Sequence, residues 1–105
     1  MKYNLNQTFV DLEGNPVLEG VGETAKPATL RHLLTVSLLN ADPQKYADGD
    51  AKYKLYKFVR RLNAKVDELA FPSEDIVLLK DCVARVYSPY VVGCIFDVLE
   101  QADAG

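Results

Sequence analysis

Hydrophobic residues recur with the period of an α-helix in two adjacent segments between residues 71 and 101. Ser88-Pro89 separates them, because proline disfavours a helical conformation in the residue before it and fits well at the first position of a helix. Two helices joined this tightly pack as a helical hairpin or corner, which we expect to form the main core. Their apolar faces consist of Ile76, Leu79, Cys82, Val83 and Val86 in the first helix, and Val91, Val92, Ile95, Phe96, Val98 and Leu99 in the second.

The first of these helices should begin at Ser73. Serine is a favoured N-cap, and Glu74 and Asp75 follow where acidic groups interact well with the positive end of a helix dipole. Adjacent carboxylates point in different directions, so this pair does not resemble a general acid–base couple.

Two further amphipathic helices precede the hairpin. Thr29 is the expected N-cap of a helix from Leu30 to about Asn40, and another helix is expected from about Ala51 to Val66. Their core stripes are Leu30, Leu33, Leu34, Ser37 and Leu38, and Leu55, Phe58, Val59, Leu62 and Val66.

The helices contain more apolar residues than a single core-facing stripe on each helix requires. Exposed apolar area on a small domain usually marks an interface. The candidate interface residues are Val36, Leu39, Val91 and Val98.

The first 20 residues have a different pattern. Residues 8–12 and 16–18 favour β-structure and flank the turn-prone tripeptide 13–15, which predicts a β-hairpin. A lone hairpin is marginally stable, so its apolar side chains need a partner, either the helices or another chain. These side chains are Phe9, Val10, Leu12 and Val17. Residues 19–28 are glycine-rich and polar, and we expect them to form a loop or linker.

The patterns together predict a mainly α (α+β) fold, a compact four-helix domain with an N-terminal β-hairpin. A chain of 105 residues suits a single domain, with the hairpin in residues 1–20 and the helical core in residues 29–101. Its 49% hydrophobic and 26% charged residues are typical of a soluble globular protein. It has no apolar segment long enough to cross a bilayer and no secretory signal pattern, so we expect a cytoplasmic protein.

Basic charge is concentrated in one helix. Between Lys45 and Lys65 there are seven basic and two acidic residues, whereas the rest of the chain has five basic and thirteen acidic residues. The candidate patch, with tyrosines interleaved, consists of Lys54, Lys57, Arg60, Arg61 and Lys65. Such a helix could bind nucleic-acid phosphates. The net charge of -3 instead favours a solvated face or one that complements an acidic surface.

No residue pattern specifies a reaction, so we expect no enzyme. His32 is the only histidine, and we expect a surface or half-buried side chain without a catalytic partner. Cys82 and Cys94 do not have the spacing of metal ligands, and we expect them to be small buried hydrophobic residues. A disulfide between them remains an alternative if their Cα atoms lie within about 7 Å of each other. The sequence predicts no metal or nucleotide site.

The order of elements resembles that of small accessory proteins of tailed bacteriophages and prophages. The residues that carry this resemblance are FVDLEGNPV, with its D-L-x-G-x-P pattern, then TLRHLL, and then SEDIVLLKDCVARVYSPYVVGCIFDVLE, with S-E-D-I followed by P-x-V-V-G. The resemblance implies a phage-encoded protein in the host cytoplasm or the virion, with virion or tail assembly as the commonest role. It implies no cofactor.

Three hypotheses follow. The first is a non-enzymatic protein that docks apolar helical surface, or the N-terminal hairpin, onto another protein or a second copy. The second is a nucleic-acid-binding or regulatory module that uses the basic helix 52–65. The third is an inhibitor of a host protein that mimics an acidic partner.

Overall fold

The computed structural model describes the backbone of residues 2–20 and 22–104, and the side chains up to residue 101. The described residues form four helices: α1 (Leu30–Leu39), α2 (Gly49–Leu62), α3 (Ser73–Val86) and α4 (Pro89–Ala104). Small β-elements near the N-terminus complete the structure, so the predicted mainly α (α+β) class is confirmed. No described helix combines the length and the apolar character needed to cross a membrane.

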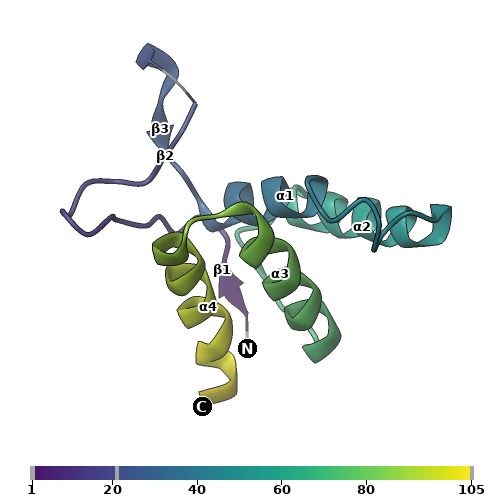
Figure 1. Ribbon diagram of the computed structural model, residues 1–105. Helices are drawn as coiled ribbons and strands as arrows, with labels where there is room; N and C mark the ends of the chain where they lie inside the picture. The colour runs from purple at the N-terminus through teal and green to yellow at the C-terminus, as the bar shows by residue number, and fades with distance from the viewer. Residues whose placement is uncertain (1, 21, 105) are drawn as a thin grey trace.

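Helix α1 lies at the centre of the helical arrangement (Figure 1). It packs against α2 and against α3, and α3 in turn packs against α4. The helices α3 and α4 run in opposite directions on either side of Ser88-Pro89 and pack against each other, which agrees with the predicted helical hairpin or corner. Helix α2 therefore rests on the rest of the molecule mainly through α1, and much of its outer surface faces solvent.

One core joins all four helices. Its fully buried aliphatic side chains come from every helix and from the N-terminal segment: Leu5, Leu30, Leu34, Leu38, Leu62, Leu79, Val83, Ile95 and Leu99. The predicted stripe of α1 is buried as a whole, including Ser37, whose hydroxyl donates a 2.7 Å hydrogen bond to the Leu34 carbonyl. That bond satisfies a hydroxyl that would otherwise be costly to bury.

The N-terminus is held in the core by a strand pair that the sequence pattern did not predict. Strand β1 (Tyr3–Asn4) pairs antiparallel with β4 (Glu68–Leu69), which lies between α2 and α3 in the chain. Tyr3 is 5% exposed, stacks on Phe71 at 5.1 Å between ring centroids, and donates a 2.8 Å hydrogen bond to the carbonyl of Leu99. These contacts join the first residues of the chain to α4.

The N-terminal ribbon differs in register from the predicted hairpin. Strand β2 (Leu18–Glu19) pairs with β3 (Lys26–Pro27), and the short 3₁₀ helix η1 (Gly22–Thr24) lies between them. The segment 19–28, expected to be a loop or linker, thus supplies half of this ribbon. The predicted turn at residues 13–15 does occur, within a single bridge between Val10 and Pro16.

Two helix boundaries also differ from the prediction. Helix α2 ends at Leu62, so Val66 lies outside it and is 41% exposed instead of completing the core stripe. Ser73 is the first residue of α3 rather than its N-cap, and Pro72 occupies the cap position without a side-chain hydrogen bond. The Thr29 cap is confirmed, because its hydroxyl accepts a 3.2 Å hydrogen bond from the His32 N–H.

Candidate functional site

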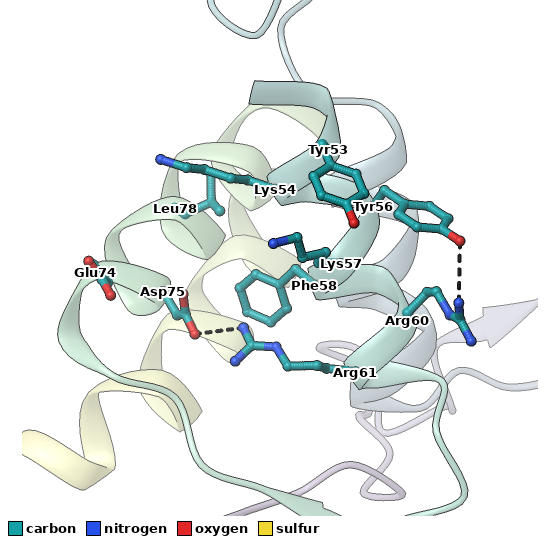
Figure 2. A pocket seen from close by; sticks show the side chains of 10 residues that line it. All are labelled: Tyr53, Lys54, Tyr56, Lys57, Phe58, Arg60, Arg61, Glu74, Asp75 and Leu78. Atoms are coloured by element: carbon teal, nitrogen blue, oxygen red, sulfur yellow. Dashed lines mark hydrogen bonds and ion pairs between the residues drawn. The ribbon is translucent and has the colours of Figure 1, made fainter. Parts of the chain in front are cut away.

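The outer side of α2 and the first turns of α3 form an open groove with a volume of about 740 Å³ (Figure 2). The side chains that line it are Tyr53, Lys54, Tyr56, Lys57, Phe58, Arg60, Arg61, Glu74, Asp75 and Leu78. Four cations and two carboxylates contribute to this lining, so the groove has a surplus of two positive charges.

The local sequence explains why α2 presents this face. Its N-cap Asp48 accepts a 2.7 Å hydrogen bond from the Ala51 N–H, and basic residues in its last turn complement the helix dipole. Phe58 and Leu62 are buried and attach the helix to the core. The opposite side of the same helix must therefore face solvent.

The connection before α2 is fixed to α3. Tyr46 donates a 3.1 Å hydrogen bond to Asp81, and the ammonium of Lys45 lies 3.1 Å from the same carboxylate. Burial, followed by the nearby Cys82 and Asp81, raises the pKa of Tyr46 to about 12, so the hydroxyl keeps its proton at neutral pH. These contacts hold the start of α2 in place.

Two exposed tyrosines stand at the centre of the outer face of α2. Tyr53 and Tyr56 are 56% and 52% exposed, and their rings stack with centroids 6.0 Å apart. The Lys57 ammonium lies 4.6 Å from the Tyr53 ring centroid, and Arg60 donates a 3.4 Å hydrogen bond to the Tyr56 hydroxyl. Stacking and cation–π contacts thus order side chains that would otherwise move freely in solvent.

The cations of the groove differ in their partners. Arg61 lies over the Phe58 ring at 4.5 Å and forms a 2.8 Å ion pair with Asp75 of α3, toward which Figure 2 shows it turned. Lys54, Lys57 and Arg60 form no ion pair with any described carboxylate. They are the cations that a bound ligand could neutralise.

The structure brings together four residues of the predicted basic patch: Lys54, Lys57, Arg60 and Arg61. Lys65 follows the end of α2 and does not line the groove, so the predicted basic helix 52–65 stops short of its last member. The acidic wall could not be predicted from the sequence, where Glu74 and Asp75 have the positions of helix-capping residues.

The predicted interface residues have different environments. Leu39 is 68% exposed, whereas Val36 and Val91 are half-buried. Val98 is only 9% exposed and belongs to the core, so its assignment to an interface was wrong. The turns of α4 place its side chain against the other helices rather than at the surface.

Leu39 borders a second groove, of about 360 Å³, on the other side of α2. This groove is mainly apolar, with Leu55 and Val59 in its wall. Tyr56 lines both grooves and therefore lies on the ridge between them. The surface from Leu39 to the tyrosines is thus continuous.

His32 has a structural contact that the sequence did not reveal. Its Nδ1 lies 3.1 Å from Oε2 of Glu19, whose other oxygen is 3.2 Å from the Lys26 ammonium. The Glu19 side chain is only 12% exposed, and Oε2 accepts no aligned hydrogen bond from the described residues. This close contact between Glu19 of β2 and His32 of α1 links the β2–β3 ribbon to the helix.

The two cysteines are free thiols. Cys82 is buried, and this burial, followed by the Asp81 carboxylate, raises its pKa to about 11. Cys94 is half-buried. Among the described residues, no group of three or more His, Cys, Asp or Glu side chains is arranged to hold a metal ion.

Comparisons of the chain with protein-family models, with curated proteins and with solved structures found no match. The chemistry of its own surface is therefore the basis for a functional proposal. The surface that combines exposed aromatic rings, unpaired cations and grooves is the outer side of α2.

Proposed function

We propose that this protein is a non-enzymatic binding protein that docks onto another protein through its α2 face. The α2 face is defined here by Leu39, Tyr53, Tyr56, Lys57 and Arg60. The observation that carries the proposal is the stacked pair of tyrosines, each more than half exposed, of which both line the first groove and Tyr56 also lines the second. Tyrosine and arginine are, with tryptophan, the side chains that most often dominate binding energy at protein interfaces.

Order in the free protein supports this role. Lys57 and Arg60 hold the two rings in place before any partner arrives, which lowers the entropy lost on binding. The rim of cations around the rings would orient a partner with acidic surface. The resemblance to phage accessory proteins suggests virion or tail assembly as the setting, and an inhibitor of a host protein would use the same face.

Site-specific photocrosslinking tests the proposal in the cell in which the chain is natively expressed. A photoreactive phenylalanine analogue replaces Tyr53, and in a matched control it replaces Ala84, an exposed residue of α3 outside the grooves. We expect a discrete protein adduct from position 53 and none from position 84. Lys57→Glu on the crosslinking chain should abolish that adduct, whereas equal labelling from both positions would contradict the proposal.

A second candidate is a nucleic-acid-binding module, favoured by cations that lie beside exposed rings along α2. Bases can stack on such rings while cations contact phosphates. Fluorescence anisotropy with labelled single-stranded and duplex DNA at low and high salt separates this candidate from the first. Binding that weakens with salt and is lost in Lys57→Glu would support it, and absence of binding at low salt would remove it.

A further inference from the structure

We propose that the protein docked on the α2 face is a second copy of this chain, whose residues 11–15 enter the groove with Leu12 leading. These five residues, Asp11-Leu12-Glu13-Gly14-Asn15, are called the acidic turn below. The proposal rests on the proposed function, because it names the occupant of the same surface.

The acidic turn is held in shape by its own hydrogen bonds. Oδ1 of Asp11 accepts hydrogen bonds from the N–H groups of Glu13 at 2.9 Å and Asn15 at 3.0 Å. The Asp11 N–H donates to the Asn15 carbonyl at 2.8 Å, and Gly14 adopts a φ of 85°, which favours glycine. The tip is therefore ordered before it meets a partner.

This ordered tip presents a leucine to solvent. Leu12 is 84% exposed, more than any other large hydrophobic side chain in the described residues, and Val10 beside it is 53% exposed. When another surface covers a leucine that a hydrogen-bonded turn holds in solvent, the burial of its apolar area favours binding. Both residues belong to the predicted hairpin, whose apolar side chains need a partner, and the helices of the same chain do not cover them.

The groove on α2 complements this tip in chemistry. Leu78 and the Tyr53 ring offer apolar surface in its lining. Lys54, Lys57 and Arg60 form no ion pair with a carboxylate of the described residues. The turn brings two carboxylates, Asp11 and the exposed Glu13, on either side of its leucine. The groove has a surplus of two positive charges, so its charge is equal in number and opposite in sign to that of the turn.

The turn and the groove lie at opposite ends of the molecule. In Figure 1 the purple segment before β2 reaches the left side of the view, whereas α2 extends to the right. One chain therefore cannot fill its own groove with its own turn. Contacts between two different surfaces join copies head to tail, which produces a ring if the rotation closes and a filament if it does not.

Sedimentation velocity over a concentration series tests this association. We expect the average mass of the wild-type chain to rise with concentration, and to fall when salt increases from about 0.1 M to about 1 M, because the paired charges are screened. Leu12→Asp and Lys57→Glu should each raise the dissociation constant roughly tenfold or more. Val77→Asp is the matched control, since Val77 is 69% exposed on α3 outside both surfaces, and it should leave the constant unchanged.

Mixing the two defective variants gives the sharpest result. Leu12→Asp keeps an intact groove and Lys57→Glu keeps an intact turn, so each mixed pair retains one competent contact. We expect the mixture to form dimers that do not grow further, at concentrations where each variant alone is monomeric. All three substitutions are at exposed positions, and far-ultraviolet circular dichroism checks that each variant is folded.

The outcomes separate this inference from the proposed function. A wild-type chain that stays monomeric at every concentration overturns self-association, as does a mixture that stays monomeric. If position 53 then still crosslinks to a different protein, the α2 face remains a docking surface with another occupant. If position 53 gives no protein adduct and the chain is monomeric, both proposals fail.

Discussion

Arg31 in α1 donates a 2.7 Å hydrogen bond from Nε to the carbonyl of Leu62, the last residue of α2. The same guanidinium donates to the carbonyl of Val66, and to Oδ1 of Asn6 at 2.7 Å. It thus satisfies carbonyl groups just where a helix end leaves them without partners, and it carries the charge that the helix dipole favours there. These bonds account for the end of α2 at Leu62, although the apolar pattern continues to Val66.

Replacement of Arg31 should therefore destabilise the whole fold. We expect Arg31→Gln to lower the free energy of unfolding by about 2 kcal/mol, because hydrogen bonds from a charged group to several carbonyls are lost together. Urea unfolding measures the change. Arg60→Gln is the control, since Arg60 is exposed and its side-chain hydrogen bond to Tyr56 lies at the surface, and it should change stability by less than about 0.5 kcal/mol. Equal stability of the two variants would contradict this role of Arg31.

Two leucines of α1 should respond very differently to truncation. Leu34 is 0% exposed in the core, and Leu34→Ala should cost about 3 kcal/mol through lost burial and a cavity. Leu39 is 68% exposed on the same helix, and Leu39→Ala should change stability by less than about 0.5 kcal/mol. Thermal unfolding followed by circular dichroism compares them. A large loss in Leu39→Ala would mean that this side chain is covered in solution.

Two glycine substitutions should have opposite signs. Gly93 lies within α4 with open space around its missing side chain, so Gly93→Ala should raise the free energy of unfolding by about 1 kcal/mol. Gly14 also has open space, but its φ of 85° strains any side chain, so Gly14→Ala should lower it by about 1 kcal/mol. Chemical denaturation measures both, and a stabilising Gly14→Ala would show that the turn is not held as described.

Alkaline pH should weaken the fold. Burial raises the pKa of Cys82 from 9.0 to about 11 and that of Tyr87 from 10.0 to about 12. The unfolded chain releases these protons at lower pH than the folded chain does. The contribution of these two groups to the free energy of unfolding is therefore fully present below pH 9 and is lost progressively between pH 9 and 12. Urea unfolding at a series of pH values should show this decline.

Cys82→Ala provides the internal control for this pH profile. It should remove the part of the decline that starts near pH 9 and leave the part that starts near pH 10, which belongs to Tyr46 and Tyr87, whose pKa values are both raised to about 12. A profile that stays flat up to pH 11 in the wild-type chain would contradict the burial of Cys82 and its raised pKa.

Much of the helical architecture could be predicted because it depends on neighbours in the sequence. The stripe on α1, the Thr29 cap and the break at Ser88-Pro89 each depend on residues within about one or two helical turns. The same periodicity predicted the basic side of α2, and four of the five residues of the predicted basic patch line the groove in the structure.

The remaining parts required contacts between distant segments. Strand β1 pairs with β4 far along the chain, with Tyr3 opposite Leu69 and Asn4 opposite Glu68, and two-residue strands carry no periodic signal. The ion pair between Arg61 and Asp75 likewise crosses from α2 to α3. Neither follows from composition or spacing.

The sequence by itself determined that four amphipathic helices would form, since local hydrophobic period, caps and proline act through short-range sterics and hydrogen bonds. Only the tertiary structure decided which apolar residues remain outside the core, because that depends on which surfaces come to cover each side chain. Val98 is thereby buried against the other helices, and Leu12 is left on an ordered turn in solvent. The candidate binding surfaces result from that distribution.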